Sequence, residues 1–144
     1  MAINPIRGGF HTVTPYLCVA GAARLIPFLE RAFGAEAVDR KDRADGSVMH
    51  AEVRLGNSMI MLGEANDEFG PMPTSVYLYM PDCDAVYQRA IAAGGTSIFD
   101  IRTLPNGERY GGVKDVCGNI WWIASHVEDV TPEEEARRWQ TFKR

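Results

Sequence analysis

The sequence lacks the features that direct a chain to a membrane or to nucleic acid. No stretch approaches the roughly 18 consecutive apolar residues of a membrane span, and residues 1–10 contain no apolar run of the kind found in signal peptides. The net charge is −4 and Lys and Arg form no cluster, so no phosphate-binding face is expected. We therefore expect a cytoplasmic protein with no nucleic-acid partner and no membrane partner.

Cysteines are few, and the common catalytic motifs are absent. Cys18, Cys83 and Cys117 are far apart and form no C-x-x-C pair, which is typical of reduced thiols in a cytosolic protein. The sequence contains no G-x-S-x-G, no H-E-x-x-H and no phosphate-binding glycine loop. Its spacing permits a Cys–His nucleophilic pair, but nothing favours one. Function therefore has to be inferred from the fold and from the faces of its strands.

Signals for strands and helices are present, and they occur in two similar series. In the first series, residues 11–20 are rich in β-branched and aromatic residues, as strands are. Residues 21–34 carry apolar side chains at helical spacing and end in a glycine. Three short strands are predicted near residues 36–42, 47–55 and 58–64. The tight turns predicted between them are Asp45-Gly46 and Gly56-Asn57.

The second series repeats the first. It contains a strand at 75–80 and a helix that begins after Asp82 and ends at a glycine pair. Three more strands are predicted near residues 96–101, 109–115 and 119–126. Arg31-Ala32 recurs as Arg89-Ala90, and LGNSMIML recurs as CGNIWWIA, at offsets of about sixty residues. The matched order of elements indicates an internal duplication.

We therefore predict one α+β domain over residues 1–144. Two β-α-β-β-β modules, at about 11–66 and 74–127, are expected to form curved eight-stranded mixed sheets around a cavity, with residues 66–73 as the linker. A C-terminal helix is predicted at about 131–142, with Thr131 as its cap and acidic residues in its first turn.

The alternation of residues 48–55 predicts which side chains face the helices. The apolar row is Met49, Ala51, Val53 and Leu55, and the polar row is His50, Glu52 and Arg54. If residues 56–57 form a two-residue turn, Glu52 lies opposite Met61. Met59 then lies on the same face as both.

In the second module the same counting gives a face rich in aromatic rings. The residues on this face are Ser75, Tyr77 and Tyr79 of the first strand, and Trp122, Ala124 and His126 of the last. Arg109 and Tyr110 either bind an anionic group or form a surface pair beside a turn. The combined concave face holds rings, methionines and a few charges, as ligand pockets do. The alternative is that this face is the solvent-exposed side of an open sheet.

Three segments carry a resemblance to a known superfamily. They are V-x-G-A-A-R-x-I-x-F-L-x-R-A-F-G-A, D-G-S-V-M-H-A-E-V-R-L-G-N-S-M-I-M-L and G-V-K-D-x-x-G-N-I-W-W-I-A. From about residue 11 to residue 130 the chain resembles the vicinal-oxygen-chelate superfamily, and more narrowly its PhnB-like, glyoxalase/bleomycin-resistance/dioxygenase branch. The resemblance implies paired modules, a homodimer and, in the enzymes, a divalent metal. Members include glyoxalases, extradiol dioxygenases, epimerases, thiol transferases that inactivate fosfomycin, and antibiotic-sequestering proteins that catalyse nothing.

The same resemblance places the metal ligands on the first and last strands of each module. The corresponding residues here are Thr14, Met61, Ser75 and Trp122, none of which is a usual ligand of a divalent transition metal. No cofactor is therefore expected. The alternative is a displaced site, formed by His50, Glu52 and His126, that holds Zn, Ni, Mn or Fe. These residues are equally compatible with local hydrogen bonds and, for His126, with an exposed strand end.

Two functions follow as hypotheses. The first is a protein that binds a small aromatic or amphipathic molecule without transforming it, through Thr14, Glu52, Arg54, Met59, Met61, Tyr77, Tyr79, Arg109 and Trp122. The alternative is a divalent-metal-dependent glyoxalase- or dioxygenase-type enzyme, with Glu52 as general base and His50 or His126 as ligand or acid. A homodimer is expected for both. The sequence does not indicate whether modules pair within or between chains.

Overall fold

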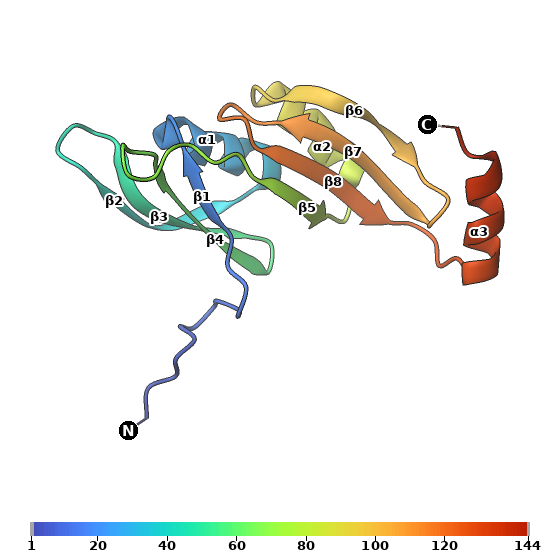
Figure 1. Ribbon diagram of the computed structural model, residues 1–144, viewed down its shortest axis with the longest axis horizontal. Helices are drawn as coiled ribbons and strands as arrows, with labels where there is room; N and C mark the ends of the chain where they lie inside the picture. Colours follow the sequence, from blue (N-terminus) through green and yellow to red (C-terminus); the bar gives the residue numbers. More distant parts are fainter. Residues whose placement is uncertain (1, 144) are drawn as a thin grey trace.

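The computed structural model describes residues 2–143 and contains two β-α-β-β-β modules followed by one helix (Figure 1). The first module consists of β1 (Tyr16–Val19), α1 (Ala22–Phe33), β2 (Glu36–Asp42), β3 (Val48–Leu55) and β4 (Ser58–Glu64). The second consists of β5 (Ser75–Tyr79), α2 (Cys83–Ala92), β6 (Thr96–Thr103), β7 (Glu108–Lys114) and β8 (Ile120–His126), and α3 (Pro132–Thr141) follows it. The predicted α+β class and order of elements are confirmed. Across residues 2–143 no helix has the length and apolar character needed to cross a membrane.

Each module folds its four strands into one mixed sheet. Sheet A has the order β1-β4-β3-β2, and sheet B has the equivalent order β5-β8-β7-β6. In both, the first and last strands of the module are parallel and the other pairs are antiparallel. The predicted hairpin register is confirmed, because Glu52 lies opposite Met61. Gly56, with a φ of 61°, supplies the left-handed residue that this two-residue turn requires.

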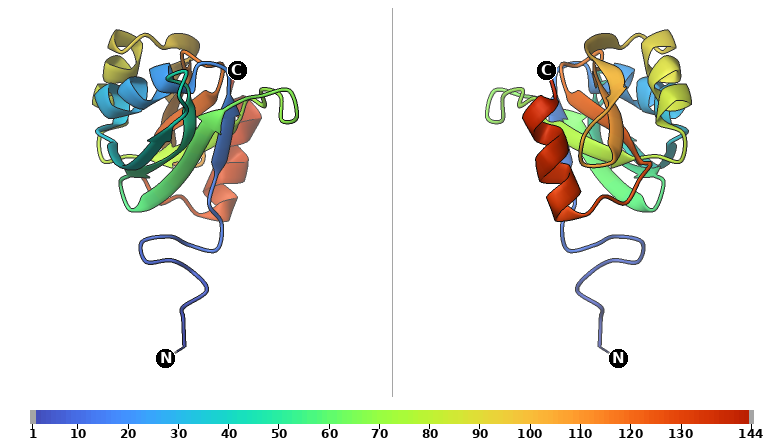
Figure 2. Two further views of the ribbon diagram at one scale, coloured as in Figure 1. Left: turned by 90° about the vertical axis from the view of Figure 1, so that its left-hand side faces the viewer. Right: turned by 90° about the vertical axis from the view of Figure 1, so that its right-hand side faces the viewer.

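The two modules are joined through their helices rather than through their strands. α1 contacts α2, and both helices lie on the same side of the sheets (Figure 2). One apolar core runs through both modules, and in it the ring centroids of Phe33 and Trp121 are 5.1 Å apart. Within residues 2–143 no strand of sheet A pairs with a strand of sheet B, so β1 and β5 are both edge strands. The sheet faces turned away from the helices are called here the outer faces.

Residues outside the helices hold the helix starts in place. At the end of β4, the Glu64 carboxylate accepts a hydrogen bond from the Gly21 N–H at 2.7 Å, which anchors the start of α1 to sheet A. The predicted caps Asp82 and Thr131 are confirmed, since each accepts a hydrogen bond from a backbone N–H in the first turn of α2 and α3 respectively.

One buried carboxylate holds the turn between β7 and β8. Asp115 accepts hydrogen bonds from the backbone N–H groups of Cys117 and Asn119 at 2.7 and 3.0 Å. It also accepts from the Asn119 amide and the Trp121 indole at 2.8 and 2.7 Å. The Asn119 amide oxygen in turn accepts from the Thr74 N–H at 3.0 Å. This network ties the turn to the core and to the start of β5.

The first strand is shorter than the sequence predicts. β1 begins at Tyr16 rather than near residue 11. Pro15 has no N–H to donate to a neighbouring strand, and residues 2–14 run away from sheet A without regular structure (Figure 1). Residues 2–14, called here the N-terminal segment, therefore lie outside the sheet of the first module.

Met49 lies on the opposite face of β3 from the one that alternation predicts. It is 45% exposed, whereas Val48 is fully buried, and the remaining members of the predicted apolar row are buried as expected. Val48 and His50 pair with consecutive residues of β2, so Met49 is an extra residue in the strand. Such a β-bulge reverses the faces of the residues that precede it.

Candidate ligand-binding site

A buried carboxylate lies on the outer face of sheet A. Glu52 is 6% exposed, and the Nε2 atom of His50 is 3.0 Å from its Oε2 atom. The Arg7 guanidinium, from the N-terminal segment, donates a hydrogen bond to the same oxygen. Arg7, and to a smaller extent His50, lower the pKa of Glu52 against the opposing effect of burial. Glu52 is therefore an ionised carboxylate that is paired with a cation from its own chain.

The N-terminal segment and sheet A border a hollow of about 590 Å³ around Glu52. The residues lining it are Pro5, Ile6, Arg7, Phe10, His11, Thr12, Thr14, His50, Glu52 and Met61. Arg7 lies over the Phe10 ring, with its Cζ atom 4.5 Å from the ring centroid. Three predicted contact residues, Thr14, Glu52 and Met61, are brought together here. Sequence reasoning missed Arg7 and Phe10 because the N-terminal segment has no periodic pattern.

A glycine makes room for an aromatic ring on the same face. Tyr16 lies in register with Met61, and its ring centroid is 5.9 Å from that of His50. A Cβ atom at Gly63 would lie 2.8 Å from the Tyr16 hydroxyl oxygen and 2.8 Å from the backbone oxygen of Met49. Tyr16 can therefore lie across β4 only because residue 63 has no side chain.

Five aromatic rings form a continuous surface on the outer face of sheet B. This surface, called here the aromatic platform, consists of Tyr77, Tyr79, Phe99, Tyr110 and Trp122. Neighbouring ring centroids are 5.1–6.4 Å apart, and Phe99 and Tyr110 are stacked with an interplanar angle of 9°. Tyr77 and Tyr79 are 42% and 65% exposed. The structure thus brings together three of the predicted contact residues and adds two rings that the sequence analysis had not grouped with them.

Gly112 provides the space for the Trp122 indole. The two residues are paired across β7 and β8, and a Cβ atom at Gly112 would lie 2.7 Å from the Cζ3 atom of Trp122. The indole Nε1–H donates a hydrogen bond to the Ser75 Oγ atom at 2.9 Å, which fixes the orientation of the ring. Sheet B therefore seats an aromatic ring against a glycine, as sheet A does at Gly63.

A second buried carboxylate borders the aromatic platform. Glu108 is 8% exposed; its Oε1 atom accepts a hydrogen bond from the Tyr79 hydroxyl at 2.5 Å, and its Oε2 atom is 2.9 Å from His126 Nδ1. The other ring nitrogen of His126 is 2.7 Å from a carboxylate oxygen of Asp129. Asp129 and Glu108 raise the pKa of His126, and the hydrogen bond to Glu108 raises the pKa of Tyr79. Burial, followed by the charge of Glu108, raises the pKa of Tyr77 to about 12.

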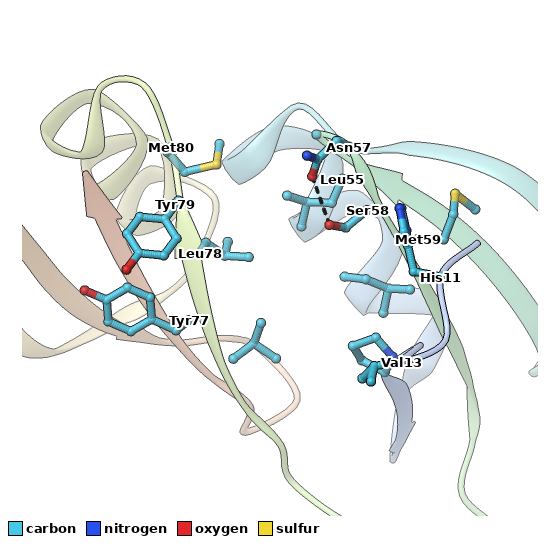
Figure 3. A pocket seen from close by; sticks show the side chains of 14 residues that line it. His11, Val13, Leu55, Asn57, Ser58, Met59, Tyr77, Leu78, Tyr79 and Met80 are labelled. Atoms are coloured by element: carbon cyan, nitrogen blue, oxygen red, sulfur yellow. Dashed lines mark hydrogen bonds between the residues drawn. The ribbon is translucent and has the colours of Figure 1, made fainter. Parts of the chain in front are cut away.

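Another hollow, of about 610 Å³, lies between the two modules (Figure 3). It is bordered by β5 on one side and by the hairpin of β3 and β4 on the other, with Met59 among its lining residues. Leu78 and Met80 point into this cleft, whereas the rings of Tyr77 and Tyr79 lie across β5 from them (Figure 3). β5 therefore presents aliphatic side chains to the cleft and tyrosines to the platform, as strand alternation requires.

The chain matches a known protein family over most of its length. The family model of the glyoxalase/bleomycin resistance protein/dioxygenase superfamily matches residues 9–123. The chain belongs to this superfamily. It is 31% identical over 133 residues to an uncharacterised protein of Mycobacterium bovis, and the match covers 85% of this chain and 88% of the other.

Two solved structures share the fold. TioX from Micromonospora sp. ML1 gives a TM-score of 0.65 at 24% identity, covering 80% of this chain and 99% of that one. A PhnB protein from Bacillus cereus gives a TM-score of 0.61 at 20% identity, covering 82% of this chain and 100% of that one. The resemblance inferred from the sequence is confirmed, and at these identities the structural likeness shows the fold alone.

The residues at the metal-ligand positions of the glyoxalase superfamily do not fit a metal. The Thr14 hydroxyl donates a hydrogen bond to the His11 carbonyl oxygen at 3.1 Å. The Trp122 indole has no lone pair to offer and donates its N–H to Ser75. Met61 offers only a thioether, a soft ligand that does not suit Mn or Mg ions. These side chains provide no set of donors for a divalent metal of the glyoxalase type.

Strand pairing shows which residue of β1 lies beside Met61 of β4 and which residue of β5 lies beside Trp122 of β8. Tyr16 is in register with Met61. Tyr77 is in register with Trp122. Thr14 precedes β1 and is not part of the ladder. Both modules thus place a tyrosine of the first strand beside the last strand.

Within one chain, His126 does not join His50 and Glu52 in a displaced metal site. It lies at the end of β8 and is bonded to Glu108 and Asp129, whereas the His50–Glu52 pair lies on β3 of the other sheet. Over the described chain, residues 2–143, no three His, Cys, Asp or Glu side chains are arranged to hold a metal ion. Within one chain, the displaced site that the sequence left open as an alternative is therefore not formed.

Two predicted contact residues lie apart from these surfaces. Arg54 is exposed on the outer face, with its Nη1 atom 3.2 Å from a carboxylate oxygen of Glu36. Arg109 points from β7 towards α2, where its guanidinium donates to both carboxylate oxygens of Asp84 at 2.7 and 2.8 Å. The expectation that Arg109 faces the ligand is corrected, since it stabilises the start of α2 instead.

Proposed function

We propose that the chain binds a small aromatic or amphipathic molecule without transforming it, and without the divalent metal used by enzymes of its superfamily. The observation that carries this proposal is the aromatic platform, whose five contiguous rings are partly open to solvent. Exposed rings in such number are unusual on a surface that touches only water, and they offer stacking area to a planar ligand.

The outer face of sheet A supports the amphipathic part of the proposal. It places an ionised carboxylate, Glu52, and the imidazole of His50 beside the Tyr16 ring and the Met61 thioether. A few polar groups among aromatic and flexible apolar side chains are the usual lining of small-molecule sites. One sheet therefore favours hydrogen bonding and the other favours stacking.

We further propose a homodimer in which sheet A of one chain and sheet B of its partner face a shared cavity. The outer edge of β1 carries only a single bridge, from Cys18 to Met72, and no strand of sheet A pairs with a strand of sheet B within residues 2–143. Beside β1, the side chains of Met49, Phe69 and Met72 are exposed. A partner that covers such edges and side chains prevents uncontrolled association. Light scattering that shows a stable 16.0 kDa monomer at micromolar concentration would contradict the dimer.

The binding proposal is tested by removing one ring of the platform. Trp122→Ala is expected to weaken the binding of quinoline, a planar bicyclic probe, by about tenfold, because it deletes a stacking surface. Trp139→Phe, a substitution in α3, is the matched control and should leave the affinity unchanged. Affinity measured by NMR titration that is the same in wild type and Trp122→Ala would show that the platform is not the site.

Metal content tests the other half of the proposal. Elemental analysis of the untagged protein, as purified and after dialysis against Zn, Ni, Mn or Fe, is expected to find no stoichiometric metal. About one metal per chain that disappears in His50→Ala or Glu52→Ala would contradict metal-free binding and favour the enzyme hypothesis.

A further inference from the structure

We infer that the aromatic platform takes a planar aromatic cation, and that Glu108 is the residue that selects its positive charge. The inference rests on the proposed function, because it names the class of ligand for the same surface. Glu108 played no part in the sequence analysis. It lies opposite His126 in register, at the edge of the platform that Tyr79 forms.

Tyr79 connects the platform to Glu108. Its hydroxyl donates its one proton to the carboxylate, so the oxygen lone pairs of Tyr79 remain for an incoming ligand. Because Tyr79 is largely exposed, a ligand on the platform meets an acceptor oxygen that is backed by a buried negative charge. Such a group favours a hydrogen-bond donor that is itself positively charged.

The rings of the platform favour the same kind of ligand. An aromatic face attracts a cation that lies within about 6 Å of the ring centroid. Glu108 acts on both tyrosines of β5, because its hydrogen bond raises the pKa of Tyr79 and its charge adds to the effect of burial on the pKa of Tyr77. The buried negative charge of Glu108 would repel an anionic ligand on the platform and attract a cation.

Within residues 2–143, His126 is the basic side chain paired with Glu108, and no arginine or lysine accompanies it. His126 divides its two ring nitrogens between Glu108 and Asp129, so the cluster keeps a net negative charge even when the imidazole is protonated. The Arg102 guanidinium donates to a backbone oxygen beyond α3 at 2.8 Å. Lys114 lies at the far end of β7. A ligand cation would therefore have no competing arginine or lysine at this carboxylate.

The first module shows how such a cation is held. There the Arg7 guanidinium lies over the Phe10 ring while it bonds to the buried carboxylate of Glu52. At Glu108 the ring and the carboxylate recur, with Tyr79 in contact, but within residues 2–143 no Lys or Arg is paired with it. The inferred ligand supplies on sheet B the chemical group that Arg7 supplies on sheet A.

Three bicyclic probes of similar size test the charge preference. N-methylquinolinium is a cation, quinoline is uncharged at neutral pH, and naphthoate is an anion. Binding of each to the full-length chain is followed by the NMR shift of the Trp122 indole N–H, which reports on the platform. N-methylquinolinium is expected to bind about tenfold more tightly than quinoline, and naphthoate more weakly than quinoline.

Glu108→Gln tests the residue assignment, because the amide keeps an acceptor for Tyr79 while removing the charge. In this variant the cation and quinoline should bind equally. Glu36→Gln removes one charge from the exposed surface of β2 and should leave the cation preference intact. The wild-type comparison requires no substitution, so it decides the charge preference even if Glu108→Gln does not fold.

The outcomes separate the two proposals. Equal binding of N-methylquinolinium and quinoline by the wild type overturns the inference and leaves the proposed function standing. A cation preference that survives in Glu108→Gln overturns the assignment to Glu108. Failure of all three probes to bind overturns the proposed function and the inference with it.

Discussion

The two modules share a topology but present different surfaces. Sheets A and B have equivalent strand orders, and the outer face of each carries one buried carboxylate bonded to one histidine. In sheet A the carboxylate, Glu52, is paired with Arg7 of the same chain. In sheet B the carboxylate, Glu108, is bonded to Tyr79, which contacts Tyr77 and through it the other three rings of the platform.

This difference shows which positions of a duplicated module are free to diverge. Most buried residues that pack against α1 and α2 are apolar in both halves, because they contribute to one shared core. The outer faces are not subject to that requirement, so one has become polar and the other aromatic. Within one chain, the duplication has separated a surface for hydrogen bonding from a surface for stacking.

The largest expected difference between the modules concerns their hairpin turns. Asp115→Ala in the second module leaves four hydrogen-bond donors without an acceptor and should lower the free energy of unfolding by about 3 kcal/mol or more. Asn57→Ala in the first module removes only an exposed contact with Ser58 and should cost less than about 0.5 kcal/mol. Urea unfolding measures both. Similar losses in the two variants would show that the turns contribute equally.

The next difference concerns the glycines that seat the rings. A methyl group at Gly63 would collide with the Met49 backbone, so Gly63→Ala should lower the free energy of unfolding by about 2 kcal/mol. At Gly112 the collision is with the side chains of Trp122 and Ile98, which can move. Gly112→Ala should therefore cost less stability but weaken quinoline binding, because the indole is displaced. Unchanged binding in Gly112→Ala would contradict the role given to Trp122.

A smaller effect on stability is expected when the Glu52 carboxylate is replaced by the neutral amide in Glu52→Gln. The folded state lowers the pKa of Glu52 below its ordinary value of 4.5, so the ionised group stabilises the fold above that pH. This contribution is lost as the pH falls through the lower, folded value. At neutral pH the free energy of unfolding should be higher for wild type than for Glu52→Gln by about 1–3 kcal/mol. This difference should decrease as the pH is lowered. Urea unfolding at several pH values checks this, and a gap that does not change with pH would contradict it.

The smallest expected effect is at His126. Asp129 and Glu108 raise its pKa above the ordinary value of 6.5, so its stabilising charge is fully present below that pH and is lost as the pH rises through the folded value. An NMR titration should place its pKa above 6.5, and Asp129→Asn should bring it closer to that value. Because the ring is exposed, the change in stability should be slight. An unaltered pKa in Asp129→Asn would contradict the pairing.

Most of the fold follows from the sequence because turns and strand alternation are local. Counting in twos from the Gly56 turn placed Glu52 opposite Met61, as the structure has it. The bulge at Met49 was not predicted, because an extra residue in a strand leaves no mark in composition. The contact between Arg7 and Glu52 was not predicted either, since it joins residues 45 positions apart through a segment with no pattern.

Part of the candidate site could have been predicted from the sequence by the same counting of alternate residues. Pairing β7 with β8 so that Gly112 lies opposite Trp122 places Tyr110 and Glu108 on the face of that indole. It also places Arg109 on the other face, towards α2. Counting in twos along β8 alone does not place the residues of its partner β7. The missing information was the register across the β7–β8 turn, which depends on the four hydrogen bonds to Asp115.

The consecutive tryptophans of β8 have a practical consequence for spectroscopy. Because neighbouring residues of a strand point to opposite faces, Trp121 is fully buried against the helices while Trp122 stands on the platform. Emission from Trp121 should shift to the red only when the chain unfolds, whereas emission from Trp122 should change when a ligand stacks on it. With Trp139 of α3 also replaced by phenylalanine, a Trp122→Phe variant would then report on folding, and a Trp121→Phe variant on occupancy of the platform. One dipeptide supplies separate optical signals for stability and for binding.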